Sequence, residues 1–215
     1  MNLLKLRKWA AVGGVLVLGL LLPGCTSLNY YKSAGPFNTV VLDAGHGGRD
    51  LGAHSVAGRP EKVHALDITL RVAEILRRAG YNVILTRSSD VFIPLPSRAA
   101  ISNRSNDSVF VSLHLNWTTR RGADGLETHF YSPRSKRLAA NIQYEICRVY
   151  RTDNRGIKPA RFHVLRNNRR PAVLVELGFL SNRREAKLME SATHRQRLAD
   201  AIARGIMAED KQRIP

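Results

Sequence analysis

Two histidines and two glutamates stand at points in the chain that a parallel sheet would bring together. His46 follows the first strand-length apolar run, His114 ends the third, and Glu176 lies near the end of the last. Functional sites of open α/β sheets form at the carboxyl ends of the strands, so these side chains can converge although they are far apart in sequence. Glu61 opens the first expected helix, and its carboxylate can turn back toward the same point.

These residue types suit metal-assisted hydrolysis. Two histidines and one carboxylate are a common ligand set for a catalytic zinc ion, which keeps its fourth position for water. The remaining carboxylate would then be free to transfer protons. The spacing is unlike the compact helical motif H-E-x-x-H, and histidines at strand ends are often ordinary surface residues. The residues alone therefore leave a zinc site and a plain sheet edge both open.

The turn that carries His46 is rich in glycine. Gly45 precedes the histidine, and Gly47 and Gly48 follow it. Glycine permits tight turns that other residues resist. A histidine on such a turn can project a ring nitrogen into a cleft, either as a metal ligand or as a proton acceptor.

The elements that must position these residues follow from the hydrophobic pattern. Apolar runs of strand length alternate with segments of helical period, which predicts a single α/β domain with a mainly parallel twisted sheet of about six strands flanked by helices. The expected strands are 39–42, 82–86, 108–114, 125–131, 163–165 and 172–177. The expected helices are 61–79, 96–103, 135–151, 183–189 and 194–207.

In the first helix, apolar residues at spacings of three and four predict the face that packs on the sheet. That face consists of Val63, Leu66, Leu70, Ala73 and Leu76. His64 is expected to lie on the helix surface, and His54 and His194 are also expected to be exposed.

The first 24 residues differ from the rest of the chain. Lys5, Arg7 and Lys8 precede an apolar run over 9–22, which is the length of a signal-peptide core and short for a spanning helix. The run ends in Leu-Pro-Gly-Cys, which resembles a bacterial lipobox and predicts lipidation of Cys25. A plain signal peptide is the alternative, since Pro23 is unusual there. Cys147 is the only other cysteine, so no disulfide within the mature chain is expected.

These assignments divide the chain into a lipoprotein signal peptide over 1–24, a lipidated tether over 25–38 and a catalytic domain over 39–215. The tether is expected because 26–37 combine serine, asparagine, glycine and proline without a periodic pattern. Lipid on Cys25 would anchor the protein to a bacterial membrane, facing the periplasm, without a spanning helix. In a cell with two membranes, Thr26 after the cysteine favours the outer membrane.

The chain is strongly basic, with a formal net charge of +17. Without the three basic residues of the leader the charge falls from +17 to about +14, which favours contact with polyanions of any kind. Nucleic acid is not expected as a partner, because the basic residues lack interleaved aromatic residues and the chain carries an export signal. Anionic polymers of the cell envelope are the better candidates.

Three segments together identify a family. The segments 41–48 (VLDAGHGG), 98–103 continuing into 111–116 (VSLHLN), and 173–182 (VLVELGFLSN) resemble the zinc-dependent N-acetylmuramoyl-L-alanine amidases often called amidase 3. The match runs in order from about residue 39 to 207. The resemblance implies a peptidoglycan hydrolase that cleaves the amide bond between N-acetylmuramic acid and the L-alanine of the stem peptide.

The resemblance also implies roles for individual residues. His46, Glu61 and His114 would bind one Zn²⁺ per chain, and Glu176 would be the catalytic carboxylate. Three further positions are candidates for contact with substrate or for support of the site: Glu127, Arg155 and Arg166. The segments 155–158 and 162–166 resemble a loop and a strand near the family's cleft, where basic residues could bind the carboxylates of the stem peptide.

Some relatives block the metal with an inserted helix that a partner protein removes. Here only Ser132, Pro133 and Arg134 separate a strand from the next helix, so no obligate activator is expected. Two other functions remain open. One is a catalytically silent peptidoglycan-binding lipoprotein, and the other is a zinc peptidase that cuts within the stem peptide.

Overall fold

The computed structural model describes residues 34–120 and 122–210. Six strands form one sheet in the order β2-β1-β3-β6-β4-β5. Neighbouring strands run parallel except for the antiparallel pair of β4 and β6, which confirms the predicted mainly parallel sheet. The strands are β1 (Thr39–Ala44), β2 (Asn82–Leu85), β3 (Ser108–Asn116), β4 (Leu126–Phe130), β5 (Asn154–Pro159) and β6 (Ala172–Phe179).

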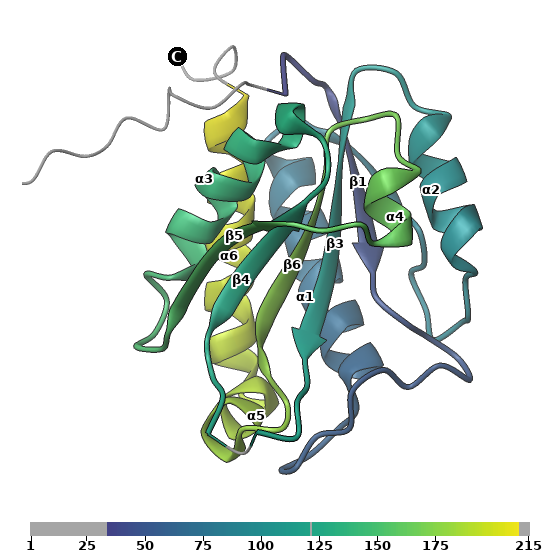
Figure 1. The fold of residues 1–215 in the computed structure, drawn as a ribbon. Coiled ribbons are helices and arrows are strands. Elements are labelled where there is room, and N and C mark those ends of the chain that lie inside the picture. Colours follow the sequence, from purple (N-terminus) through teal and green to yellow (C-terminus); the bar gives the residue numbers. More distant parts are fainter. Residues whose placement is uncertain (1–33, 121, 211–215) are drawn as a thin grey trace, which may run out of the picture.

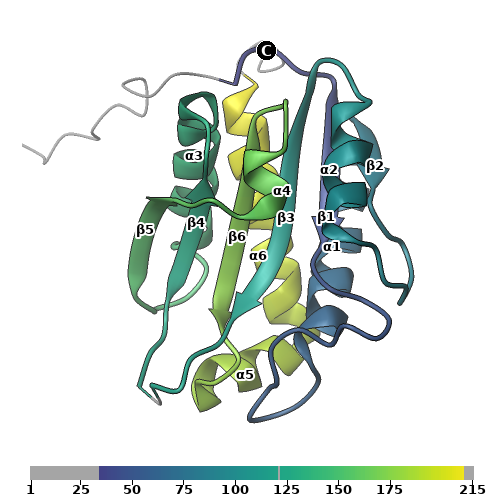
Figure 2. The same cartoon turned by 45° about the vertical axis from the view of Figure 1, so that its right-hand side comes forward.

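Helices cover the two faces of the sheet unequally (Figures 1 and 2). The three longest, α1 (Glu61–Arg78), α3 (Lys136–Ile146) and α6 (Ala192–Glu209), pack together on one face. The shorter α2 (Leu95–Asn103) and α4 (His163–Arg166) pack on the other. A 3₁₀ turn, η2 (Pro133–Ser135), precedes α3, and α5 (Arg183–Glu190) follows β6 at its carboxyl end.

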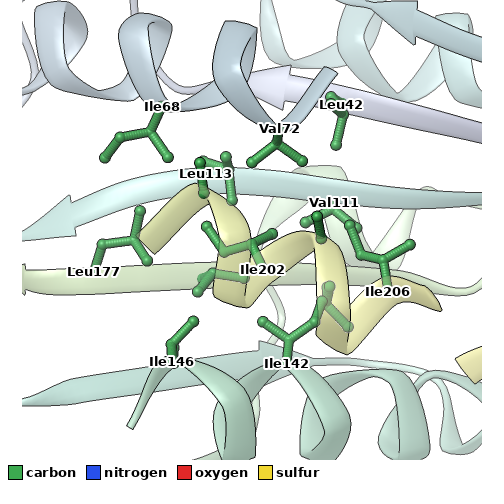
Figure 3. Close-up of a cluster of buried hydrophobic side chains, with 14 of the residues drawn as sticks. Leu42, Ile68, Val72, Val111, Leu113, Ile142, Ile146, Leu177, Ile202 and Ile206 are labelled. Carbon is green, nitrogen blue, oxygen red and sulfur yellow. The ribbon is translucent and has the colours of Figure 1, made fainter. Parts of the chain in front are cut away.

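The main core lies between the sheet and the three long helices. Successive side chains of a strand point to opposite faces, and Leu42, Val111 and Leu177 are strand residues that point to this face. Figure 3 shows them packed with Ile68 of α1 and Ile202 of α6. This face supplies most of the buried apolar surface that stabilises the domain.

The opposite face of the sheet has a much smaller core. Val41, Phe110 and Leu174 pack there beneath Val164 and Leu165 of α4. Farther along the same strands, toward their carboxyl ends, the alternation that buries these residues places polar side chains on this face. They are Asp43, Ser112, His114 and Glu176. Because α2 and α4 cover only part of the face, its carboxyl end is available for a site.

Two predictions near β5 are wrong. The segment 163–165, predicted as a strand, is the helical turn α4, and β5 (Asn154–Pro159) is a strand where a loop was expected. Two adjacent apolar residues, Val164 and Leu165, fit one buried helical turn as well as a short strand. β5 lies at the sheet edge and is polar and mostly half-buried or exposed, so it carries no apolar run to mark it.

The predicted packing face of α1 is only partly correct, because Ala73 and Leu76 are fully buried as predicted but the rest of the face is not. Leu70 is 38% exposed, whereas Ala65, Ile68 and Val72 are fully buried. This rotation brings His64 inside, where its side chain is 1% exposed and Nε2 lies 3.0 Å from Glu190 Oε1. Apolar residues occur on more than one side of this helix, so periodicity does not decide which side is buried. Contact with the sheet buries the side that also points Glu61, the first residue of the helix, toward the sheet edge.

His194 is likewise buried rather than exposed, and its ring lies edge-on to that of Tyr150 with 4.7 Å between centroids. The predicted helix over 135–151 ends at Ile146.

The described part of the predicted tether packs on the domain, since Phe37 is 3% exposed and the Ala34 amide donates to Glu209. The predictions for 1–33, including the signal peptide and Cys25, lie outside the described residues. Within 34–210, as far as it is described, no helix has the length and apolarity needed to span a bilayer.

The contact between α3 and α6 depends on a glycine. A Cβ added at Gly205 would lie 2.6 Å from Ile142 Cα. Gly205→Ala should therefore destabilise the domain by about 1–3 kcal/mol through overpacking, against a gain of about 1 kcal/mol from the better helix propensity of alanine. Urea denaturation would measure the net loss. The exposed neighbour substitution Arg204→Ala should change stability by less than about 1 kcal/mol, and equal effects of the two would contradict the packing argument.

Candidate metal centre

Three side chains from different elements converge at the carboxyl edge of the sheet. Glu61 Oε2 lies 3.1 Å from His46 Nε2, and Glu61 Oε1 lies 2.8 Å from His114 Nδ1. One potential ligand atom from each residue falls within 4.8 Å of the other two. Ligands about 2.1 Å from a tetrahedral zinc ion lie about 3.4 Å from one another. The spacing of these atoms therefore fits a single metal ion.

The charge of the cluster favours a cation. Burial opposes ionisation of Glu61, but hydrogen bonds with His114 and His46 outweigh it and hold the pKa of Glu61 well below its usual range. Burial opposes protonation of His114, yet the bond to Glu61 raises the pKa of His114 to about 9. The pKa of His46 is raised for the same reasons. An ionised carboxylate shared by two imidazoles attracts either protons or a metal ion, and the two compete for the same atoms.

Glu61 is fixed by its position as the first residue of α1. Its side chain is 4% exposed, and it accepts hydrogen bonds from the backbone amides of Ala53, at 2.8 Å, and Leu115, at 2.9 Å. The positive end of the helix dipole further stabilises a carboxylate in the first turn. The helix start, the loop after β1 and the end of β3 are thereby tied to one side chain.

His46 is held by backbone that is itself clamped. The residue has a φ of 60°, an uncommon conformation for any residue other than glycine. Arg98, 2% exposed, donates from Nη2 to the carbonyl of His46 at 2.6 Å and from Nη1 to Asp43 at 2.7 Å. Arg87 donates to the carbonyls of Ala44 and Gly45. These two buried arginines fix the turn in the conformation that presents His46 to the cluster.

The second ring nitrogen of His46 also has a neighbour. His46 Nδ1 lies 2.9 Å from Asp50 Oδ2, and backbone hydrogen bonds between Gly47 and Asp50 close the turn between them. A carboxylate beside the outer nitrogen of a metal-binding histidine fixes the tautomer and the ring orientation. Asp50 is therefore close enough to favour a proton on Nδ1 of His46, which leaves Nε2 facing the cluster.

Glu176 lies beside the cluster on the central strand β6. It is the register partner of His114 on β3, and among the described residues no group forms a hydrogen bond with its buried Oε2. Burial raises the pKa of Glu176 to about 7. A carboxylate that titrates near neutral pH and keeps a free oxygen can both accept and donate a proton.

The four residues border a shared hollow of about 410 Å³, which Asn116 and Trp117 also line. A second hollow of about 430 Å³ adjoins it on the side of α2 and α4. That side has an apolar wall, which is formed by Phe92, Ile93, Leu95, Phe162, Val164 and Leu174. The cluster therefore lies in the floor of an open cleft with chemically different sides.

The remaining candidates are distributed unequally. Glu127 on β4 is the register partner of Glu176, and its hydrogen bonds with His129 and Lys158 lower its pKa to about 2 against the opposing effect of burial. Arg155 Nε lies 3.2 Å from Glu127 Oε2. Arg166, by contrast, is exposed at the end of α4 and does not line the hollow formed by its neighbours.

Sequence reasoning missed Arg87 and Asp50 and gave Arg98 no role. Asp50 follows His46 by four residues in the glycine-rich turn, which is a signal that could have suggested it. Arg87 had no such signal, because it reaches the turn only through the pairing of β2 with β1.

The fold and site define an α/β protein with a candidate metal centre: a His-Glu-His cluster lies beside a carboxylate with an oxygen unpaired among the described residues, at the carboxyl edge of a mainly parallel sheet. Residues 40–208 match the family model described as N-acetylmuramoyl-L-alanine amidase, and the chain belongs to that family. The predicted family is confirmed, and peptidoglycan amidase activity is what this membership supports.

Individual relatives agree. The chain is 38% identical to the protein YqiI of Bacillus subtilis, covering 78% of this chain and 82% of the relative. It is 31% identical to the N-acetylmuramoyl-L-alanine amidase AmiA of Escherichia coli, covering 82% and 78%. Among solved structures, the amidase AmiC2 of Nostoc punctiforme superposes with a TM-score of 0.76 at 39% identity, covering 79% and 95%. The chain spans only 37% of the longer amidase LytC of B. subtilis.

Gly45 gives a direct test of the geometry. A Cβ at this position would lie 2.4 Å from the ring of His114. Gly45→Ala should push that imidazole away from Glu61 and weaken zinc binding at least tenfold, because an open catalytic site depends on three protein ligands in place. Zinc affinity would be measured by competition with a chromophoric chelator.

Gly122→Ala is the matched control, because nothing lies within 4 Å of its added Cβ. It should leave zinc affinity unchanged. Unaltered affinity in the Gly45 variant would show that His114 does not bind the metal in this arrangement.

Proposed function

We propose that this protein is a zinc-dependent N-acetylmuramoyl-L-alanine amidase, which hydrolyses the amide bond between N-acetylmuramic acid and the L-alanine of the peptidoglycan stem. One observation supports the proposal: buried Glu61 contacts two histidines, and Glu176 lies beside them with an oxygen that has no hydrogen-bond partner among the described residues. The chain also belongs to the amidase family. The products would be a glycan strand and a peptide with an N-terminal alanine.

His46, Glu61 and His114 would hold one zinc ion. When bound, zinc would lower the pKa of a coordinated water and polarise the carbonyl of the scissile amide. The three ligand side chains are between 4% and 23% exposed, so one side of the site stays open to substrate. Asp50, Arg87 and Arg98 keep the ligand positions fixed while substrate enters and leaves.

Glu176 would move the proton. Its ionised carboxylate accepts a proton from the attacking water as the water oxygen bonds to the carbonyl carbon. The same proton then passes to the amide nitrogen as the carbon–nitrogen bond breaks, which makes the peptide amine a good leaving group. Burial raises the pKa of Glu176 above its usual range, which makes its carboxylate a better proton acceptor than an exposed one.

Glu127 and Arg155 are proposed to contact substrate or to support the site from the β5 side of the cleft. Their side chains share an ion pair beside Glu176. The position of Arg166 gives no support for the same role.

The two rival functions remain testable. A silent peptidoglycan-binding lipoprotein would not need Glu176 beside a complete ligand set, because a binding surface requires no proton acceptor. A peptidase within the stem would use the same metal chemistry, so only the products distinguish it from an amidase.

We further propose that the protein is exported and anchored to a bacterial membrane by lipid on Cys25, facing the periplasm, and on the outer membrane where two membranes are present. The leader pattern over 1–25 and the net charge of +17 support an envelope location. The connection from β4 to α3 comprises only residues 131–135, which supports activity without a partner protein.

Glu176→Gln removes the proton acceptor and keeps the shape of the side chain. Release of peptide from purified peptidoglycan should fall at least 100-fold, while zinc content stays at one ion per chain. Mass spectrometry of the fragments should show N-terminal alanine and intact muramic acid for the wild type, and a chelator should abolish release until zinc is restored.

Glu74→Gln, an exposed substitution on α1, is the matched control and should keep full activity. Undiminished release by the Glu176 variant would remove its assigned role. Fragments cut inside the stem would identify a peptidase, and a wild type that binds zinc and wall but releases nothing would identify a binding protein.

Cys25→Ser tests the anchor. The wild type should fractionate with membranes and incorporate labelled palmitate, and the variant should lose the label and become soluble in the periplasm, because its acyl chains supply the membrane affinity. Cys147→Ser, which changes the cysteine inside the domain, should keep both properties. Membrane association of an unlabelled Cys25 variant would instead indicate an uncleaved leader or a bound partner.

A further inference from the structure

One row of side chains crosses three neighbouring strands on the open face of the sheet and ends beside the edge strand β5. His114 on β3 pairs in register with Glu176 on β6, and Glu176 pairs with Glu127 on β4. Glu127 in turn pairs with Gly156 on the edge strand β5. Adjacent strands lie about 4.8 Å apart, so Glu127 is about one strand spacing from Glu176, on the side away from the metal cluster.

Glu127 holds two cations at this place. Lys158 Nζ and Arg155 Nε both contact its Oε2, the second at 3.2 Å. Asn116 Nδ2 donates to its Oε1 at 2.9 Å. Glu127, Arg155 and Lys158 together carry a net positive charge. The contacts with Glu127 hold both cations on the side of β5 that faces Glu176, where a substrate could reach them.

Both cations keep donors for a ligand. The side chains of Arg155 and Lys158 are 34% and 42% exposed. A lysine has three donors and an arginine five, and the bonds to Glu127 use only part of them. Arg155 also lies 5.1 Å from the centroid of the Phe179 ring, which limits its freedom of movement. A partly immobilised, partly exposed pair of cations is suited to binding a carboxylate.

The surroundings of Arg155 are basic. Arg155 lines a hollow of about 430 Å³ together with Arg120 and Thr118. Asn116 and Trp117, which precede Thr118 in the chain, line the hollow of the metal cluster. Because Asn116 also donates to Glu127, that carboxylate and its two cations adjoin the hollow of the metal cluster. On the side toward β1, the adjoining hollow presents Phe92 and the carboxylate of Asp50.

Resting on the proposed function, we propose that Arg155 and Lys158 bind the first free carboxylate of the stem peptide, and so direct the peptide toward β5 and the sugar toward α2. An extended chain advances about 3.3–3.6 Å per residue. A carboxylate on the second residue of the stem lies about 7 Å beyond the scissile bond, which matches cations about one to two strand spacings from Glu176.

Two synthetic substrates test this directly. N-acetylmuramoyl-L-alanyl-D-isoglutamyl-L-lysine and its isoglutaminyl counterpart differ only in whether the second residue carries a carboxylate or a neutral amide. The wild type should cleave the isoglutamyl substrate with a kcat/KM about 10- to 100-fold higher, mostly through KM, because each of the two cations contributes a charge-assisted hydrogen bond worth about tenfold.

Lys158→Gln and Arg155→Gln should each lower kcat/KM about tenfold for the isoglutamyl substrate and less than twofold for the isoglutaminyl one. Arg78→Gln is the matched control, because Arg78 is also an exposed arginine paired with a glutamate, on α1. It should change neither value. Calorimetry with the tripeptide L-alanyl-D-isoglutamyl-L-lysine should show the same loss of affinity without any need for catalysis.

Equal losses on both substrates would overturn the proposal, since they would mean that the cations act through Glu127 or through folding. So would a wild type that cleaves both substrates equally well. If the wild type cleaves neither substrate nor peptidoglycan but still binds the tripeptide through these cations, the amidase function fails while the carboxylate site stands.

Discussion

The shared carboxylate of Glu61 is the interaction on which the rest of the site depends. It contacts both imidazoles of the candidate metal cluster and accepts hydrogen bonds from two backbone amides. An ionised carboxylate that is almost fully buried is costly unless each of its lone pairs is satisfied. The arrangement therefore requires the start of α1, the turn after β1 and the end of β3 to meet at one point, and any shift of one of them leaves a buried charge unpaired.

The two faces of the sheet have different roles. One face packs in the main core, and the other carries the residues of the candidate site. One face of every central strand packs against α1, α3 and α6 and forms the main core. The alternation that buries those residues presents His114, Glu176 and Glu127 on the other face, in register across neighbouring strands. The candidate site residues are thus carried by strands whose other face is packed in the main core, and the helices on their own side are too short to cover them.

Residues outside the cluster fix the positions of its side chains. His46 has left-handed backbone, which costs about 1–3 kcal/mol for a residue other than glycine. Arg98 and Arg87 offset this cost with hydrogen bonds to the carbonyls of the turn. Gly45 and Gly52 leave room that a side chain would take from His114 and Glu61. The glycine-rich turn is therefore required by close approach as much as by backbone conformation.

The sequence by itself determined the fold class, the family and the residues of the candidate cluster, because the apolar strands and the motifs around His46, His114 and Glu176 are local patterns. It did not determine the phase of α1, since apolar residues such as Leu70 and Ile68 occur on both faces and only packing on the sheet decides which is buried. It also predicted a loop for β5 and a strand for α4. β5 carries no apolar run to mark it as a strand, and the two adjacent apolar residues of α4 fit a strand as well as a helical turn.

Only the tertiary structure revealed that Arg87 and Arg98 clamp the turn of His46, and that Lys158 and Arg155 share Glu127. Each of these contacts joins side chains from segments far apart in the chain. Their geometry depends on strand order and register, which no local pattern encodes.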